Sequence, residues 1–264
     1  MYPFTLERPT ATADAVKLAA AGGRPLAGGQ TLLASMKLRL SSSDQLVDLA
    51  GIKELTGICR DGDALVIGAM TRHADVASHA DVKALIPALA DLAGNIGDRQ
   101  VRAMGTLGGS VANNDPAACY PSAVLALGAT VHTTSRKIAA DDFFKGMFST
   151  ALNDGELITA ISFPIPKRAA YMKFKQSASR FAMVGVFLAQ TASGVRVAVT
   201  GASSDGVFRH AGLEQALSAS FTPQAAAGVK IDATGLNHDI HGSAAYRANL
   251  ISVQTQRAVT KALG

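Results

Sequence analysis

The sequence predicts an α+β protein built in two successive parts. In the first part, short apolar runs typical of strands alternate with amphipathic stretches typical of helices. After the segment Pro164-Ile165-Pro166-Lys167-Arg168, the pattern changes to consecutive strands followed by helices. The 264 residues are 48% hydrophobic and 17% charged, the composition of a folded globular protein with room for more than one domain. We therefore place a domain boundary at the proline-containing segment.

The first part begins with a predicted helix from Thr12 to Ala21, with Thr12 as its N-cap and Gly22-Gly23 at its end. The elements expected next are a strand over 25–27, a helix over 32–38, strands over 46–49 and 65–68, a helix over 81–93, a helix over 122–127, and strands over 130–133 and 157–163. In the second part, strands over 183–191 and 195–200 are joined by Ser193-Gly194, a hairpin signal. The clearest closing helix covers 244–263.

A glycine-rich stretch runs from Gly105 to Pro116 with the sequence GTLGGSVANNDP. Paired glycines lack a Cβ, so the backbone can take positive φ and come close to a ligand. Thr106 and Ser110 add hydroxyls, and Asn113 and Asn114 add amide donors. Successive free N–H groups in such a turn make a concavity for oxyanions, whereas a single stretch of this kind is also typical of an ordinary hairpin.

A second stretch of the same character, LAGGQTLL over 26–33, follows a predicted strand and leads into a predicted helix. Two such stretches facing each other could share the charges of a nucleotide diphosphate through their main-chain donors. The sequence contains neither G-x-G-x-x-G nor G-x-x-x-x-G-K-[ST], so a Rossmann or P-loop interpretation is not supported.

Composition excludes several classes of protein. The net charge of +5 is spread without runs of Lys or Arg, which argues against nucleic-acid binding. Cys59 and Cys119 are the only cysteines; two cannot hold an iron–sulfur cluster, their spacing matches no zinc site, and they fit reduced thiols in a cytoplasmic protein. The N-terminus lacks the features of a signal peptide, and no apolar run is long enough to span a membrane.

Other candidate sites have a simpler interpretation. The pair His238 and His241 has metal-ligand spacing, but the residues around it favour a polar loop. Asp141-Asp142 favours a loop or helix start over an acid–base pair. Lys37 and Arg39 fit either phosphate contacts or a solvated helix face. No Ser-His-Asp set is present, and no histidine neighbours Cys119 in the sequence.

Taken together, five segments resemble one family. They are Ala27–Leu32, Gln100–Ser110, Asp115–Ala118, Lys173–Gln176 and Phe181–Val184. The chain is similar over its whole length to the FAD-binding medium subunit of molybdenum hydroxylases, the family of carbon monoxide dehydrogenase and the xanthine dehydrogenases. The order of the segments and the separation of the two glycine stretches make the resemblance specific.

The resemblance implies a vanillyl-alcohol-oxidase-type (PCMH) FAD-binding domain over 1–165, with subdomains over about 1–57 and 58–165. A C-terminal domain of antiparallel sheet and helices would cover 170–264. It implies cofactor contacts at Ala27, Gly28, Gly29, Gln30, Thr31, Leu32, Thr106, Leu107, Gly108, Gly109, Ser110, Asn113, Asp115, Ile158, Lys175 and Phe181. Ile158 would contact the flavin, Lys175 would place a positive charge near its ring, and Phe181 would stack on it. No catalytic residue and no metal ligand is expected.

Three residues depart from the family pattern. Cys119 stands where the family usually has Asp, Arg180 where related subunits often have Asp, and Ser110 where Asn is usual. None removes a main-chain donor, so FAD binding is expected to survive, while the flavin potential and the electron acceptor are open. Neither glycine stretch contains a histidine, so the FAD is expected to be noncovalent.

The function implied is that of an electron-transfer subunit. The flavin would take electrons from a [2Fe–2S] centre on a small partner subunit, and a large partner subunit would carry the molybdenum cofactor and hydroxylate the substrate. The assembly would be a heterotrimer or a dimer of heterotrimers in the cytoplasm. The alternatives are a stand-alone FAD-dependent oxidase of the same fold and an interaction module that has lost the cofactor.

Overall fold

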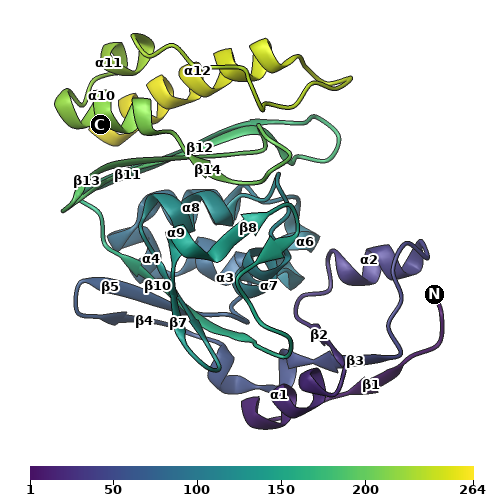
Figure 1. Ribbon diagram of the computed structural model, residues 1–264. Helices are drawn as coiled ribbons and strands as arrows, with labels where there is room; N and C mark the ends of the chain where they lie inside the picture. Colours follow the sequence, from purple (N-terminus) through teal and green to yellow (C-terminus); the bar gives the residue numbers. More distant parts are fainter.

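Three main sheets follow one another along the chain of the computed structural model, which describes residues 1–264. Their strand orders are β1-β3-β2, β4-β5-β10-β6-β7 and β11-β12-β13-β14, and β8 and β9 form a small fourth sheet. We refer to the parts built on the three main sheets as the N-terminal, central and C-terminal units. In Figure 1 the N-terminal unit lies at the lower right, and the C-terminal sheet and its helices lie across the top of the central unit.

The N-terminal unit is a small parallel sheet. It consists of β1 (Thr5–Glu7), α1 (Thr12–Ala20), β2 (Arg24–Leu26), α2 (Leu32–Lys37), β3 (Gln45–Asp48) and the 3₁₀ turns η1 (Leu49–Gly51) and η2 (Lys53–Leu55). Parallel neighbours need a crossover connection, which α1 and α2 help to supply. Its core is small and includes Met70 and Leu157 from the central unit, so the two units share buried surface.

The start of α1 differs from the prediction. Ala11, not Thr12, is the N-cap residue, and it makes no side-chain capping bond. The Thr12 hydroxyl instead donates to Glu54, which also accepts from the Thr12 N–H at 3.1 Å. A tertiary contact has therefore replaced the local cap.

The central unit holds the largest core, 32 buried residues around an antiparallel sheet. Its elements are β4 (Ile58–Asp61), β5 (Ala64–Gly68), α3 (His73–Ser78), α4 (Ala80–Leu85), α5 (Pro87–Gly94), α6 (Arg99–Met104), α7 (Leu107–Asn113), α8 (Tyr120–Ala126), β6 (Thr130–Thr133), β7 (Lys137–Ala139), α9 (Ala140–Phe143), β8 (Phe144–Gly146), β9 (Ser149–Thr150) and β10 (Ile158–Pro164).

The helix predicted over 81–93 is two helices. The chain leaves the helical conformation at Ile86, where φ is −139° and ψ is 67°, and α5 begins at Pro87. Proline has no N–H to continue the preceding helix and disfavours helical geometry in the residue before it. The prediction of one continuous helix was therefore wrong.

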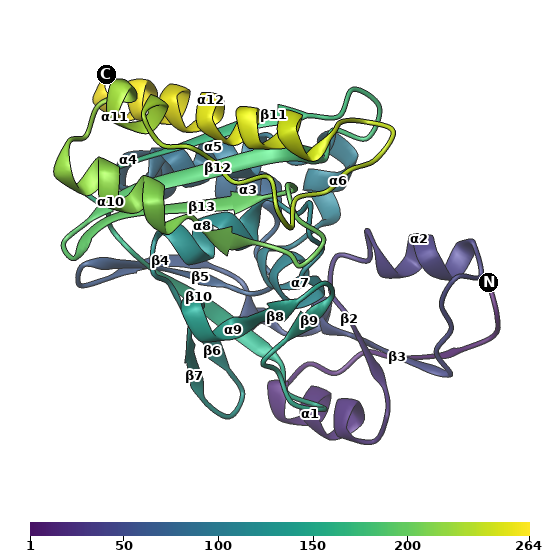
Figure 2. The ribbon, with the colours of Figure 1, turned by 45° about the horizontal axis from the view of Figure 1, so that its top comes forward.

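The C-terminal unit places one sheet between two layers of helices (Figure 2). Its elements are β11 (Arg168–Lys175), β12 (Ala182–Thr191), β13 (Gly194–Thr200), β14 (Phe208–Arg209), α10 (Ala211–Ala219), α11 (Pro223–Ala227) and α12 (Ala244–Leu263). On β12, Phe187 belongs to the core of the central unit, whereas Val186 and Leu188 pack in the core of the C-terminal unit. Because successive residues of a strand point to opposite faces, this strand is buried on both sides.

The predicted hairpin is present, with its turn one residue earlier than expected. Thr191 pairs with Gly194, so Ala192 and Ser193 form the two-residue loop, and Gly194 has φ +124°. The predicted closing helix over 244–263 is observed with the same bounds, capped by the Ser243 hydroxyl, which accepts from the Tyr246 N–H. No helix in the structure combines the length and apolar character needed to cross a membrane.

Candidate functional site

The two glycine-rich stretches lie against each other, although they are far apart in sequence. A β-carbon added to Gly28 would stand 2.2 Å from the Met104 carbonyl oxygen and 2.6 Å from the Gly105 Cα. One added to Gly109 would stand 3.1 Å from the Ala27 Cβ. Glycine is needed at these points because the backbones of the N-terminal and central units approach closely there.

The first stretch, Gly28–Leu32, offers free main-chain donors. It connects β2 to α2, and none of its N–H groups donates a hydrogen bond within the chain. Gly29 has φ +70°, the left-handed geometry that glycine adopts without strain. The Gln30 side chain turns back and donates to the Gly28 carbonyl oxygen at 3.1 Å. A run of unoccupied N–H groups in a strand-to-helix connection is the arrangement that binds oxyanions.

The second stretch differs from the prediction, because Gly108 and Gly109 lie in the first turn of α7 and have negative φ. Thr106 is the N-cap, and its hydroxyl accepts from the Gly109 N–H at 3.2 Å. The expected open turn with free donors is therefore absent here.

The neighbouring segment 69–73 takes up the other main-chain groups of the second stretch. Leu107 N–H donates to the Thr71 oxygen at 3.0 Å, and Gly108 N–H donates to the Ala69 oxygen at 2.8 Å. A β-carbon on Gly108 would stand 2.5 Å from the Ala69 Cβ, so this glycine permits close packing inside the protein. The Thr106 N–H and the Ser110 hydroxyl keep free hydrogen-bonding capacity on this side.

The residues after α7 have divided roles. Asn114 ends the helix with φ +43°, and its side-chain amide donates to the Gly146 and Ser149 oxygens at 2.8 Å each. Asn114 therefore holds the β8–β9 turn rather than offering a donor to a ligand. Asp115 accepts from the Ala117 N–H at 2.8 Å, while the half-buried Asn113 side chain makes no hydrogen bond.

The three predicted flavin contacts outside the glycine stretches lie on separate elements. Ile158 begins β10 and is buried in the central core. Lys175 ends β11 and is exposed, and Phe181, just before β12, is 49% exposed. The turn between these strands meets the loop before α6, where the Arg180 guanidinium donates to the Gly97 oxygen at 3.4 Å.

Sequence reasoning missed Lys173, which joins the central and C-terminal units. Its amine donates to the Asn95 oxygen at 2.6 Å and to the Arg180 oxygen at 3.0 Å, and lies 3.6 Å from the Cys119 sulfur. The available signal was its position two residues before Lys175, which puts both lysines on one face of a strand. At Cys119, the departure from the family pattern, the thiol faces an amine.

His73 was also missed as a support of the second stretch. Its main-chain N–H donates to the Gly105 oxygen at 2.9 Å, and the centre of its buried ring lies 5.3 Å from that of the Tyr120 ring. Burial, assisted by the nearby charge of Arg102, lowers the pKa of His73 to about 4. The imidazole is therefore neutral at physiological pH and packs behind the glycine stretch.

Two carboxylates near the other candidate sites, Asp141 and Asp239, form ion pairs within the chain. Asp141 forms ion pairs with Arg196 at 2.6 Å and Arg209 at 3.3 Å. Between the two histidines of the 238–241 segment, Asp239 pairs with the buried Arg247 at 2.7 Å. Both carboxylates therefore fix the positions of neighbouring elements.

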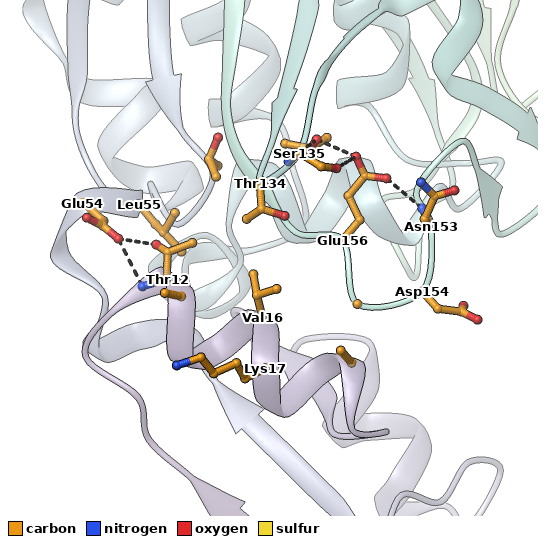
Figure 3. A pocket seen from close by; sticks show the side chains of 15 residues that line it. Thr12, Val16, Lys17, Glu54, Leu55, Thr134, Ser135, Asn153, Asp154 and Glu156 are labelled. Atoms are coloured by element: carbon orange, nitrogen blue, oxygen red, sulfur yellow. Dashed lines mark hydrogen bonds between the residues drawn. The ribbon is translucent and has the colours of Figure 1, made fainter.

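A cavity of about 960 Å³ lies at another contact between the N-terminal and central units (Figure 3). It is bounded by α1, the turn after β6 and the turn at 153–156, and none of its lining residues belongs to the glycine stretches. A β-carbon on Gly155 would stand 3.1 Å from the Ala20 Cα, so this turn packs closely on α1.

Glu156 organises this second contact. It accepts from the Thr133 and Ser135 hydroxyls at 2.6 and 2.8 Å and pairs with Arg136 at 3.1 Å. The hydrogen bonds from Arg136 and these neighbours lower the pKa of Glu156 to about 2. Because its side chain is only 3% exposed and fully partnered, Glu156 supports the turn and is not available to a ligand.

Comparison with known proteins decides the family. Residues 2–166 match the FAD-binding domain in molybdopterin dehydrogenase. The chain belongs to this family. It is 39% identical over 199 residues to the glyceraldehyde dehydrogenase medium chain of Sulfolobus acidocaldarius, covering 72% of this chain and 71% of that one. It is 33% identical over an alignment of 277 residues to the carbon monoxide dehydrogenase medium chain of Hydrogenophaga pseudoflava, covering 98% and 96%.

The similarity extends to the three-dimensional structure. A chain of the reconstituted CO dehydrogenase from Oligotropha carboxidovorans superimposes with a TM-score of 0.91 at 33% identity, covering 99% of both chains. The recognition of the family from the sequence is confirmed, and with it the assignment to oxidoreductase subunits that contain an FAD-binding domain.

Proposed function

We propose that this chain is the FAD-carrying electron-transfer subunit of a heterotrimeric molybdenum hydroxylase. The observation that carries the proposal is the run of unoccupied N–H groups over Gly28–Leu32, set against the second glycine stretch in a chain of an FAD-binding family. The relatives named as medium chains of dehydrogenases support a role within a larger complex.

The residues present fit a dinucleotide diphosphate. The diphosphate of FAD carries two negative charges and several acceptor oxygens, and the first stretch supplies consecutive main-chain donors without a lysine. Gly28 and Gly109 let the two stretches approach each other closely, and the Thr106 N–H and Ser110 hydroxyl add donors from the second stretch. The remaining first-stretch positions, Ala27, Gln30, Thr31 and Leu32, and the neighbouring Leu107, Gly108, Asn113 and Asp115, would complete or support the cradle.

FAD would supply the redox chemistry, because it exchanges electrons singly or in pairs. The protein would bind and orient it: Phe181 has the exposed area to stack on the ring, and the exposed Lys175 would favour negative charge on it. Ile158, which is buried, would act through the shape of the wall behind the ring. Noncovalent attachment is supported because His73, the histidine beside the second stretch, is enclosed in the core.

A small [2Fe–2S] subunit would deliver electrons to this flavin, and a large subunit with the molybdenum cofactor would hydroxylate the substrate. The complex would be a heterotrimer or its dimer, and a cytoplasmic location remains a prediction from the sequence. Which substrate is hydroxylated depends on the large subunit, and the final electron acceptor depends on surfaces outside the diphosphate cradle.

The test is a flavin titration of the purified chain, followed by absorption and fluorescence. We expect stoichiometric, noncovalent FAD that is released on denaturation and no oxidation of organic substrates by the chain alone. A chain that binds no flavin contradicts the proposal. Substrate turnover by the isolated, FAD-loaded chain would instead establish the stand-alone oxidase.

A further inference from the structure

Four segments around the glycine stretches share an unusual composition. They are 36–40 at the end of α2 and beyond it, 99–104 of α6, 145–148 from the end of β8 to β9, and 175–181 from the end of β11 to β12. Each contains at least one Lys or Arg and at least one large apolar residue, and none contains Asp or Glu. We call these four segments the basic rim.

The apolar side chains of the basic rim are exposed to an unusual degree. Leu38 and Leu40 are 71% and 78% exposed, and Phe148 is 57% exposed. Met104, Met147 and Phe181 are about half exposed, between 49% and 55%. Large apolar side chains that gather on one surface are typical of an interaction site.

The cations of the basic rim are Lys37, Arg39, Arg99, Arg102, Lys145, Lys175 and Arg180. None of them forms an ion pair within the chain. Two guanidinium groups donate to main-chain oxygens, Arg102 to Ile96 at 2.9 Å and Arg180 to Gly97 at 3.4 Å. The guanidinium of Arg39 instead lies 5.5 Å from the centre of the Tyr2 ring.

Three of the four segments are connected through neighbouring residues, and the fourth, 145–148, contacts the end of α7. The Arg180 guanidinium reaches the Gly97 oxygen just before α6, and the end of α6 packs on Gly28, which precedes α2. The Phe148 N–H donates to the Asn114 oxygen at the end of α7. In both views α2, α6 and the β11–β12 turn lie toward the same side of the molecule (Figures 1 and 2).

We infer that the basic rim is the docking surface for a protein partner that presents an acidic face with an apolar centre. This rests on the proposed function, and it assigns the rim to the iron–sulfur partner of the flavin subunit. Seven unpaired cations exceed what one bound diphosphate needs, and the exposed Leu, Met and Phe side chains call for a wide apolar contact. Unpaired charge around apolar side chains steers and orients a partner of opposite charge.

The test uses the affinity-tagged chain produced in the cells from which it comes, with FAD and iron measured per chain in the purified complex. The variant Arg99→Glu/Lys145→Glu changes exposed rim residues that lie outside the predicted cofactor contacts. The matched control, Lys53→Glu/Lys137→Glu, changes the net charge equally with exposed lysines outside the rim.

We expect the wild type and the control to keep both FAD and iron. The rim variant should keep its FAD, and its iron content per chain should fall about tenfold, because close charge pairs at the interface would be lost. Raising the salt concentration should also dissociate the iron-containing partner from the wild type, because salt screens the charges at the interface. The variant Met147→Ser/Phe148→Ser should also lose iron and keep FAD.

Three results would overturn the inference: full iron in the rim variant, equal loss of iron in the control, or a wild-type complex without iron. A rim variant that keeps iron but loses its FAD would show that the rim serves the cofactor, which also overturns it. Absence of FAD from every preparation, with iron present in the wild type, would count against the proposed function instead.

Discussion

The two glycine-rich stretches have similar sequences and opposite hydrogen-bonding states. In Gly28–Leu32 the N–H groups are free, while in Leu107–Gly109 they are bonded to Thr71, Ala69 and Thr106. Both stretches need glycine for close approach, the first to Met104 and the second to Ala69. The comparison shows that a glycine pair indicates a close neighbour and does not reveal whether that neighbour is a ligand or the protein itself.

From this difference we propose separate roles for the two stretches. The first would bind the diphosphate with its own donors, and the second would form the rigid wall against which the first is placed. These roles predict that some variants change stability alone and others also change FAD affinity. A variant that changes both, where only one change is predicted, would contradict the division.

The largest expected effect is on stability, at the contact between the N-terminal and central units that Glu156 organises. Glu156→Gln should lower the free energy of unfolding at pH 7 by up to about 3 kcal/mol, because the pKa of Glu156 falls from 4.5 to about 2 on folding. A lowered folded-state pKa gives stabilisation that is complete above pH 4.5 and lost as the pH falls toward 2. Urea unfolding of both proteins across this range should show the difference vanish at low pH.

The same variant tests whether FAD binding depends on this contact. The cavity beside Glu156 contains no residue of the glycine stretches, so FAD affinity should be unchanged at pH 7. A stability difference that persists at pH 2, or a loss of FAD affinity, would contradict the assigned role.

The next effect concerns the second stretch as a structural wall. Gly108→Ala should lower the free energy of unfolding by about 2 kcal/mol, because its β-carbon would meet Ala69 at 2.5 Å. Gly94→Ala is the control: it lies at the end of α5 with only the Ala77 Cβ near, at 3.8 Å, and should be neutral or slightly stabilising. Chemical denaturation compares them, and equal effects of the two substitutions would show that the close packing is unimportant.

A smaller effect separates binding from strain in the first stretch. Gly29→Ala and Gly62→Ala both place alanine at positive φ, +70° and +57°, and each should cost about 1.5 kcal/mol of stability for this reason. At Gly29 the β-carbon would also meet Leu33 Cδ1 at 2.8 Å, so its cost should be somewhat larger. Only Gly29 lies among the free donors, so only its substitution should weaken FAD binding in a fluorescence titration. If both substitutions, or neither, weaken FAD binding, the first stretch is not the binding element.

The smallest effect concerns the cap of α7. Thr106→Val removes the hydroxyl that accepts from the Gly109 N–H and should lower the free energy of unfolding by about 1 kcal/mol, while Thr106→Ser should retain it. Thermal unfolding measures the difference. A serine variant as destabilised as the valine variant would show that the capping bond does not contribute.

Much of the fold could be predicted because local signals agree with the tertiary structure. The helix Ala244–Leu263 has an amphipathic pattern and a serine cap, and the strand Thr130–Thr133 has the expected apolar core residue. The break at Ile86 follows from Pro87, which disfavours helical geometry in the residue before it. The helix α7 was not predictable from propensity, because packing on Ala69 overrides the low helix preference of Gly108 and Gly109.

The close approach of the two glycine stretches was predicted from the sequence, whereas their hydrogen bonding was predicted only in part. The glycine pairs indicated that two stretches approach a neighbour, and the structure brings them together. The occupied donors of α7 depend on the Ala69 and Thr71 carbonyls, which no local pattern announces. Lys173 and His73 act on residues distant in sequence, so their contacts required the folded chain.

Amide hydrogen exchange with and without FAD tests the division of roles most directly. The account predicts that the amides of Gly28–Leu32 exchange rapidly in the free chain and become protected when FAD binds, while those of Leu107–Ser110 are protected in both states. Protection that appears on FAD addition at Leu107–Ser110 and not at Gly28–Leu32 would contradict it.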